Sequence, residues 1–202
     1  MDTLLDALRE ALQLLTSFDP ALLEVVAMTL RVTGGALVLA TLIGLPMGAA
    51  LGLRDRVPAG GCLMPIIYTG MGLPPVVIGL FVSLMLWRYG PLGDLGLMYT
   101  PTAMIIAQTI IAAPIIAGLS FAAILGINPK LRLQLISLGA TPWQASRLLI
   151  REARLGLMAA VIAGFGRVIS EVGASMMVGG NIKGQTRVLT TATVMEVGKG
   201  NY

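Results

Sequence analysis

Long apolar stretches alternate with short polar segments along the chain. Three stretches carry no charged side chain over more than the roughly 20 residues that a helix needs to cross the hydrocarbon core of a membrane. They are residues 32–53, 61–87 and 102–126, and a fourth, 155–178, is apolar except for Arg167 and Glu171. The pattern predicts an all-α membrane protein with one domain over residues 1–202 and spans at about 25–53, 61–87, 102–126 and 155–178.

Prolines and glycines interrupt every one of these stretches. Such residues are tolerated in a span where neighbouring helices or a wet cavity satisfy the freed backbone groups. Pro74 and Pro75 are adjacent near the middle of the second stretch and remove two backbone donors at one place. We therefore expect a broken helix that lines a cavity there.

The composition supports a membrane protein and excludes several chemistries. Of the 202 residues 56% are hydrophobic and 12% charged, whereas ordinary soluble domains are about 25% charged. Histidine is absent and Cys62 is the only cysteine, which excludes a His/Cys metal site and a disulfide within the chain. The glycine-rich segments 179–186 and 197–202 lack the spacing of a phosphate-binding loop. We expect neither catalytic residues nor a metal or other cofactor.

The basic residues indicate which side of the membrane faces the cytoplasm, because cytoplasmic loops are enriched in Lys and Arg. The first loop between spans holds Arg54 and Arg56, and the third holds Lys130, Arg132, Arg147, Arg151 and Arg154. We place both loops in the cytoplasm and the N-terminus outside. The net charge of +4 comes from scattered residues, which disfavours nucleic acid as a partner.

The first residues of the chain have a different pattern. Leucines recur at helical spacing opposite charged residues; they are Leu4, Leu5, Leu8, Leu12 and Leu15. This spacing predicts an amphipathic helix over about 2–17, which lies on the membrane surface or packs on the protein's own helices.

The loop over residues 127–154 has two helix start signals. Asn128 followed by Pro129 provides a cap and a first-turn proline, and Gly139 is placed to end the helix in the left-handed conformation. Thr141, Pro142 and Gln144 then match a capping box. The loop is therefore predicted to form two short helices broken at Gly139, the second continuing into the fourth span. Either its arginines meet anionic lipid headgroups, or it is a docking surface for a soluble partner.

Charges in and after the fourth span are candidates for a solute pathway. Arg167 and Glu171 are four residues apart on a helix and are able to pair, and charges at membrane depth usually face the bundle interior. They form either a structural pair or, for Arg167, part of an anion pathway. The segment 179–187 offers backbone donors, Asn181 and Arg187 to an oxyanion, or it is a polar re-entrant turn.

Residues 138–149 followed by 171–190 resemble the permease subunit of binding-protein-dependent ABC importers, over roughly residues 22–202. The segments 171–182 and 183–192 are closer to the oxyanion branch of the family, and are most similar to tungstate permeases, with molybdate and sulfate permeases as near relatives. The resemblance implies the type I permease fold in the cytoplasmic membrane of a bacterium or archaeon. It also implies a homodimer, a separate cytoplasmic ATPase subunit and an extracytoplasmic oxyanion-binding protein.

The resemblance identifies Gly139 with the glycine of the loop that contacts the ATPase. The expected contact residues are Leu138, Gly139, Ala140, Thr141, Pro142 and Trp143. The expected pathway residues are Arg167, Glu171, Ser175, Asn181 and Arg187.

The chain departs from the family pattern in three places. Leu133, Gln134 and Leu135 stand where the family has Glu-Ala-Ala, and Glu152 stands where it usually has proline. The family usually has a further span after the segment that ends here, so the chain is either truncated or has one helix fewer. A secondary transporter or channel, with Arg167 and Glu171 as its coupling or selectivity charges, and a membrane anchor for a cytoplasmic protein are the alternatives from other classes.

Overall fold

The structure is a computed structural model that describes residues 17, 19–54 and 63–200, and within these ranges every regular element is helical. The elements are α2 (Pro20–Gly52), α3 (Leu63–Gly72), α4 (Pro75–Leu86), the 3-10 turn η1 (Gly93–Leu95), α5 (Pro101–Leu125), α6 (Pro129–Ser137), α7 (Pro142–Glu152), α8 (Arg154–Ile169), α9 (Gly173–Gly179) and α10 (Leu189–Gly198). This confirms the all-α prediction. The amphipathic helix expected over 2–17 lies outside the described residues, apart from Ser17.

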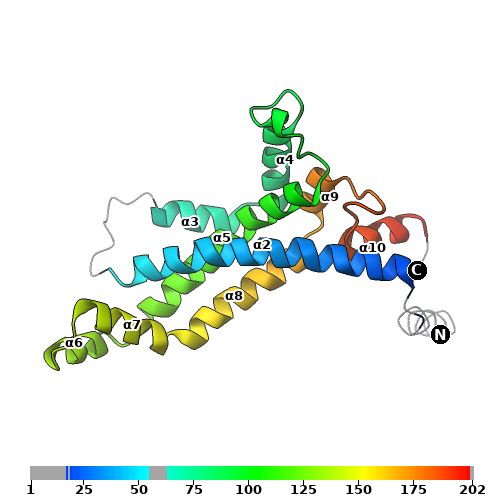
Figure 1. Cartoon of the computed structure of the whole chain (residues 1–202). Helices are drawn as coiled ribbons and strands as arrows, with labels where there is room; N and C mark the ends of the chain where they lie inside the picture. The colour runs from blue at the N-terminus through cyan, green and yellow to red at the C-terminus, as the bar shows by residue number, and fades with distance from the viewer. Residues whose placement is uncertain (1–16, 18, 55–62, 201–202) are drawn as a thin grey trace.

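Two helices, α2 and α5, are each long and apolar enough to cross a membrane without a break. They run side by side along the molecule (Figure 1). Asp19 caps α2 by accepting hydrogen bonds from the backbone of Ala21 and Leu22, and Thr100 caps α5. Pro46 and Pro114 lie inside these helices and end neither of them.

Glycines on one face of α2 bring it against α5. A Cβ atom on Gly44 would lie 2.6 Å from the carbonyl oxygen of Ala113, and one on Gly52 would lie 2.9 Å from the Cβ of Ile124. A Cβ on Gly48, between them, would be closer still to the carbonyl oxygen of Ala117. Small residues at such a contact let two helix backbones approach in a membrane. The spacing of the three glycines, four residues apart, keeps them on the α2 face that meets α5.

The second apolar stretch is broken, as Pro74 and Pro75 predict. It forms α3 and α4, whose axes differ by 105°, and Pro74 lies between them in an extended conformation. The expected single span over 61–87 is therefore a broken or re-entrant pair, because a proline pair cannot continue a hydrogen-bonded helix. Figure 1 shows α4 leaving the direction shared by α2, α3 and α5.

The fourth apolar stretch also differs from a straight span. It consists of α8 and α9, bent by 59°, with the break at residues 170–172. The helix that begins at Pro142 is interrupted at Ala153 before α8 begins, although backbone hydrogen bonds from Ala153 to Leu149 and from Leu157 to Ala153 still cross the junction. The polar segment 179–202 contains a further helix, α10, which the sequence analysis did not predict.

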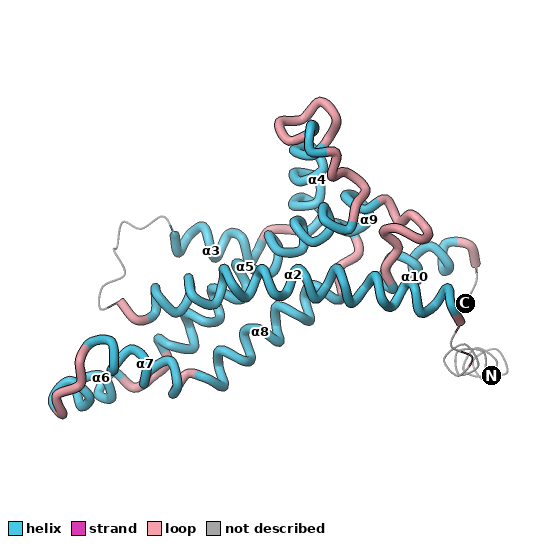
Figure 2. The backbone as a smooth tube through the Cα atoms, in the orientation of Figure 1, coloured by secondary structure: helices cyan, strands magenta, loops and turns pink. Residues whose placement is uncertain are grey.

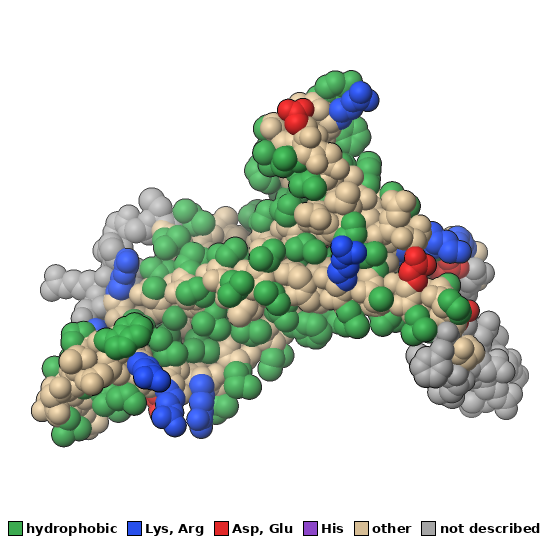
Figure 3. All heavy atoms as spheres, viewed as in Figure 1, with side chains coloured by type: hydrophobic (Ala, Val, Ile, Leu, Met, Phe, Trp, Pro, Cys, Tyr) green, Lys and Arg blue, Asp and Glu red, His purple; other side chains and the backbone are tan. Residues whose placement is uncertain are grey.

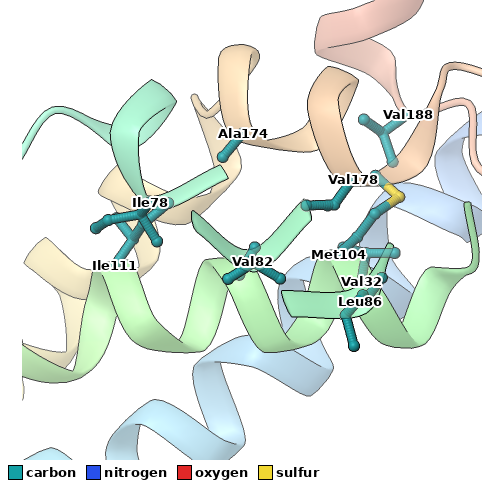
Figure 4. Close-up of a cluster of buried hydrophobic side chains, with 11 residues drawn as sticks. Val32, Ile78, Val82, Leu86, Met104, Ile111, Ala174, Val178 and Val188 are labelled. Atoms are coloured by element: carbon teal, nitrogen blue, oxygen red, sulfur yellow. The ribbon is translucent and has the colours of Figure 1, made fainter. Parts of the chain in front are cut away.

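Helix α5 forms the centre of the bundle. Of its most apolar window 67% is buried, compared with 33% for α2. Figure 4 shows buried side chains of α2, α4, α5 and α9 meeting around Met104. A second cluster at the other end of the bundle joins Ala49 and Ile124 to Ala153 and Leu157. Loops gather beside α4 and between α9 and α10, away from α6 and α7 (Figure 2).

The α2–α5 contact leads to a stability prediction. Replacing Gly48 by Ala should lower the free energy of unfolding by about 1–3 kcal/mol, because the added methyl group meets backbone atoms that cannot move aside cheaply. Gly34→Ala in the same helix is the control: its Cβ meets no atom within 4 Å, so this change should be neutral or stabilising by up to about 1 kcal/mol. Thermal unfolding of the purified variants measures both. Equal effects would contradict close packing at Gly48.

Candidate functional site

The loop over residues 127–154 folds as two capped helices. The Asn128 side chain accepts a hydrogen bond of 3.0 Å from the Lys130 backbone at the start of α6. Gly139 ends this helix with φ +86°, and the backbone N–H groups of Gly139 and Ala140 donate to the carbonyls of Ile136 and Leu135. These two bonds define a Schellman motif, which needs a residue in the left-handed conformation and so favours glycine. The predicted break at Gly139 is confirmed.

The start of α7 is a complete capping box. The Gln144 backbone donates to Oγ1 of Thr141 at 3.3 Å, and the Thr141 backbone donates to Oε1 of Gln144 at 2.8 Å. Pro142 occupies the first helical turn, where its missing N–H leaves no partner unsatisfied. The elbow between α6 and α7 is therefore fixed locally on both sides of Gly139.

The elbow presents apolar side chains to its surroundings. Leu138 is 85% exposed and Trp143 is 77% exposed, although both are residue types that proteins usually bury. A groove of about 930 Å³ lies beside Leu138. Its lining residues are Leu138, Gly139, Ala140, Gln144, Arg147, Leu148, Ile150 and Arg151. An exposed apolar group rimmed by polar residues on a rigid elbow is a surface suited to a protein partner.

The elbow is attached to the membrane helices at several points. The Arg132 guanidinium donates a 2.9 Å hydrogen bond to the Leu53 carbonyl oxygen, at the C-terminal end of α2. On the other side, Ala145 and Leu149 of α7 are buried. Sequence analysis counted Arg132 only as a cytoplasmic charge; its distant carbonyl partner, 79 residues away, leaves no local signal. The elbow is thus bonded to the end of α2 and packed against its neighbours through α7.

At the opposite end of the bundle, Glu171 does not pair with Arg167. No ion pair joins these residues within the part of the chain that the structure describes, which corrects the expectation. The helix ends at Ile169, so the helical spacing that would bring the two side chains together is lost. Glu171 is 6% exposed, and its Oε1 accepts a 2.9 Å hydrogen bond from the Ala174 backbone at the start of α9. Arg167 is half-buried.

Ser175 is buried in α9 and bonds to α5. Its Oγ accepts a 3.0 Å hydrogen bond from Nε2 of Gln108. The Oε1 of Gln108 is buried without a partner among the described residues. Sequence analysis missed Gln108, although an amide inside an uncharged span is a signal that could have identified it. The bond ties α9, at the end of the fourth stretch, to the central helix α5.

Asn181 and Arg187 lie together in the turn between α9 and α10. The Arg187 side chain donates two hydrogen bonds of 3.3 Å to Asn181, one to Oδ1 and one to the backbone oxygen. Gly180 and Asn181 both have positive φ, and the buried Thr186 hydroxyl donates to the Gly179 carbonyl. The predicted polar turn is therefore a rigid loop held by its own side chains.

A small pocket of about 160 Å³ separates this loop from the first turns of α2. Lys183 and Arg187 line it from the loop and Glu24 lines it from α2. Of the five expected pathway residues, Asn181 and Arg187 are hydrogen-bonded to each other. Ser175 bonds instead to Gln108 and Glu171 to the Ala174 backbone.

Comparison with known proteins now assigns the class. The family described as the binding-protein-dependent transport system inner membrane component matches residues 40–195. The chain belongs to this family: it is a membrane permease subunit of an ABC importer and not an enzyme. Membership implies an ATPase subunit and a substrate-binding protein as partners.

The similar proteins include several permeases for anions. A tungstate uptake permease protein, TupB, of Peptoclostridium acidaminophilum is 39% identical and aligns with 100% of this chain and 88% of its own length. A probable anion ABC transporter permease of Haloferax volcanii is 42% identical over 89% of this chain and 79% of its own length. Molybdenum and sulfate permeases also match, at 26% identity.

A solved structure confirms the fold. The crystal structure of an amino acid ABC transporter with histidines superposes with a TM-score of 0.66 at 22% sequence identity, covering 93% of this chain and 83% of that one.

The role of Glu171 as a helix cap can be tested by stability measurements. Glu171→Leu should lower the free energy of unfolding by about 1–2 kcal/mol because it removes the acceptor for Ala174. Glu171→Gln retains that oxygen and should cost less than about 1 kcal/mol. Arg167→Gln should change stability little. If the Gln variants at both positions cost as much as Glu171→Leu in thermal unfolding, an ion pair rather than a cap would be indicated.

Proposed function

We propose that the chain is the permease subunit of an ABC importer that carries an oxyanion, tungstate, across the cytoplasmic membrane. The single observation that carries the coupling part of this proposal is the rigid elbow at Gly139, which exposes Leu138 and Trp143 and is bonded to the end of α2. A loop that only connected two spans would need neither feature.

The ATPase subunit contacts the elbow through Leu138, Gly139, Ala140, Thr141, Pro142 and Trp143. Leu133, which stands in place of the usual family glutamate, is 66% exposed on α6. Apolar contact therefore replaces part of the ionic contact that the family pattern provides. Burial of apolar surface stabilises an interface by about 25 cal/mol per Å², and a large aromatic side chain such as Trp143 typically dominates it.

Movement of the ATPase subunits then reaches the membrane helices as rigid-body rocking. The elbow is joined to α2 by the Arg132–Leu53 hydrogen bond and to α5 and α8 through Ala153, Leu157 and Ile124. Since packed helices shift as units rather than deform continuously, the displacement is carried along α8 toward α9.

The assembly contains two copies of this chain, two ATPase subunits and one extracytoplasmic binding protein. The N-terminus lies outside and the loop 127–154 lies in the cytoplasm, because Lys130, Arg132 and the arginines of α7 and α8 make this loop the most basic one. Lipid surrounds the apolar faces of α2 and α8.

The solute passes beside Arg167, Glu171, Ser175, Asn181 and Arg187, near the bend between α8 and α9. Arg167 has no carboxylate partner among the described residues, so its charge is available to an anion. Glu171 is already occupied as a cap and serves to shape the bend rather than to bind the solute.

The choice of tungstate over molybdate and sulfate rests on the relatives, because these are all tetrahedral dianions. The two most similar relatives described above are a tungstate permease and an anion permease. Selective capture belongs to the binding protein in such importers, so the permease requires a passage and not a tight site.

The docking surface can be tested with a matched pair of tryptophans. Trp143→Ala should reduce co-purification of the ATPase subunit about tenfold or more, the effect of truncating a typical aromatic anchor. Trp87→Ala at the end of α4 removes a tryptophan that is 48% exposed and should leave co-purification unchanged. Gly139→Asp, which places a charge at the same elbow, should release the ATPase as well. Equal retention by the Trp143 and Trp87 variants would reject this surface.

The pathway can be tested at Arg167. Arg167→Glu should abolish oxyanion uptake while the ATPase still co-purifies, because the reversed charge repels a dianion at the bend but lies far along the chain from the elbow. Arg88→Glu in the loop after α4 is the charge-matched control and should retain uptake. Normal uptake by the Arg167 variant would remove this residue from the pathway.

A further inference from the structure

Three arginines follow one another along α7 and the first turn of α8. Arg147 and Arg151 are four residues apart in α7 and so share a face, and Arg154 is the first residue of α8. All three are exposed, and none has an ion pair or a side-chain hydrogen bond within the ranges that the structure describes. Figure 3 shows basic side chains gathered over α7 and the start of α8.

The surface changes abruptly beyond Arg154. Leu155, Met158 and Ile162 lie on one face of α8 at helical spacing, and each is more than half exposed. Met158 is four residues after Arg154 and so shares its face. In a protein of the inner membrane, such a face contacts lipid hydrocarbon. The phosphates of the same lipids then lie at the end of this face, at the level of Arg154.

The groove at the elbow extends this cationic surface. Arg147 and Arg151 line the groove together with Leu148 and Ile150. The groove therefore offers both guanidinium groups and apolar side chains to a ligand. Arginine binds phosphate through paired hydrogen bonds, and its long stem packs on apolar surface while the charge stays at the polar boundary. Glu152 adjoins the three arginines in sequence, but it is one residue away from Arg151, about 100° around the helix, and is exposed.

We infer that Arg147, Arg151 and Arg154 form a binding site for the headgroup of an anionic phospholipid of the cytoplasmic leaflet. The acyl chains of that lipid lie along Leu155, Met158 and Ile162. Leu138 and the arginines of α7 line the same groove, so the two partners occupy adjoining parts of it: the ATPase at Leu138 and Trp143, and the lipid headgroup at the arginines. The lipid holds α7 at the membrane boundary, which fixes the point about which the elbow moves.

The test uses the full chain alone in nanodiscs, without the ATPase. Retention of phosphatidylglycerol from mixtures with phosphatidylcholine is measured by native mass spectrometry. One Arg→Gln change should weaken phosphatidylglycerol binding about fivefold, the factor expected for about 1 kcal/mol per basic residue near an anionic surface. The combined variant R147Q/R151Q/R154Q should weaken it about a hundredfold. Lys130 is an exposed cation on α6. Lys130→Gln neutralises it and is the matched control, which should change phosphatidylglycerol binding less than twofold.

Two further arms identify the ligand. Inorganic phosphate should not displace the lipid. The acyl chains of the lipid bind the apolar face of α8, and phosphate alone has no such contact. Arg→Lys at the three positions should retain more binding than Arg→Gln, because lysine keeps the charge. It should still bind less than the unchanged chain, because lysine cannot form the paired hydrogen bonds of arginine.

Each possible outcome decides the proposal. Unchanged phosphatidylglycerol retention in the triple variant, or in any single variant that folds if the triple variant does not, would overturn it. So would competition by inorganic phosphate at equal concentration. A separate measurement follows ATPase binding in pure phosphatidylcholine. If the triple variant loses ATPase binding there but retains phosphatidylglycerol in the lipid mixture, the arginines belong to the ATPase contact and the lipid site is rejected. The lipid measurement omits the ATPase, so a negative result there would not bear on the proposed transport function. A negative result in the ATPase co-purification would likewise not bear on the lipid site.

Discussion

The close contact between α2 and α5 is the constraint on which the rest of the structure depends. Gly44, Gly48 and Gly52 leave no space for a side chain against the α5 backbone, so the two unbroken spans form one unit. This contact makes α5 the central helix, with α3, α4, α8 and α9 packed around it. The bent and broken helices elsewhere are tolerated because they pack on this pair of unbroken helices.

The α2–α5 pair joins two ends of the bundle that differ in structure, the elbow between α6 and α7 at one end and the bend between α8 and α9 at the other. At the end that carries α6 and α7, the bundle is closed by short-range caps, by the Ala49–Leu157 cluster and by Arg132. At the opposite end, α9 turns away from α8 and packs through the buried Ala174 and Val178 into the cluster around Met104. Polar contacts from Gln108 to Ser175 and from Thr190 to the Glu171 carbonyl add to this packing.

Features that depend on neighbouring residues were predictable from the sequence. The caps at Asn128 and Thr141, the left-handed end at Gly139 and the break at Pro74 each arise from interactions within about five residues, so the local sequence specifies them. The four apolar stretches were found for the same reason, because hydrophobicity is a property of the segment itself.

Features that depend on distant partners were not predictable. The expected pair of Arg167 and Glu171 assumed a continuous helix, whereas α8 ends between them and Glu171 caps α9 instead. The bond from Arg132 to Leu53 spans 79 residues and the bond from Gln108 to Ser175 spans 67. The angle of 105° between α3 and α4 is likewise set by how α4 packs on α5 and α9, which no local pattern encodes.

Uptake by reconstituted vesicles tests the central claim most directly, namely that this chain is a passage driven by a separate ATPase. The permease is reconstituted with its ATPase subunit, with ATP enclosed in the lumen and tungstate-loaded binding protein outside. The account predicts that tungstate accumulates only when ATP, the ATPase and the binding protein are all present. Accumulation driven by an ion gradient in vesicles that contain the permease alone would contradict it and would identify a secondary transporter.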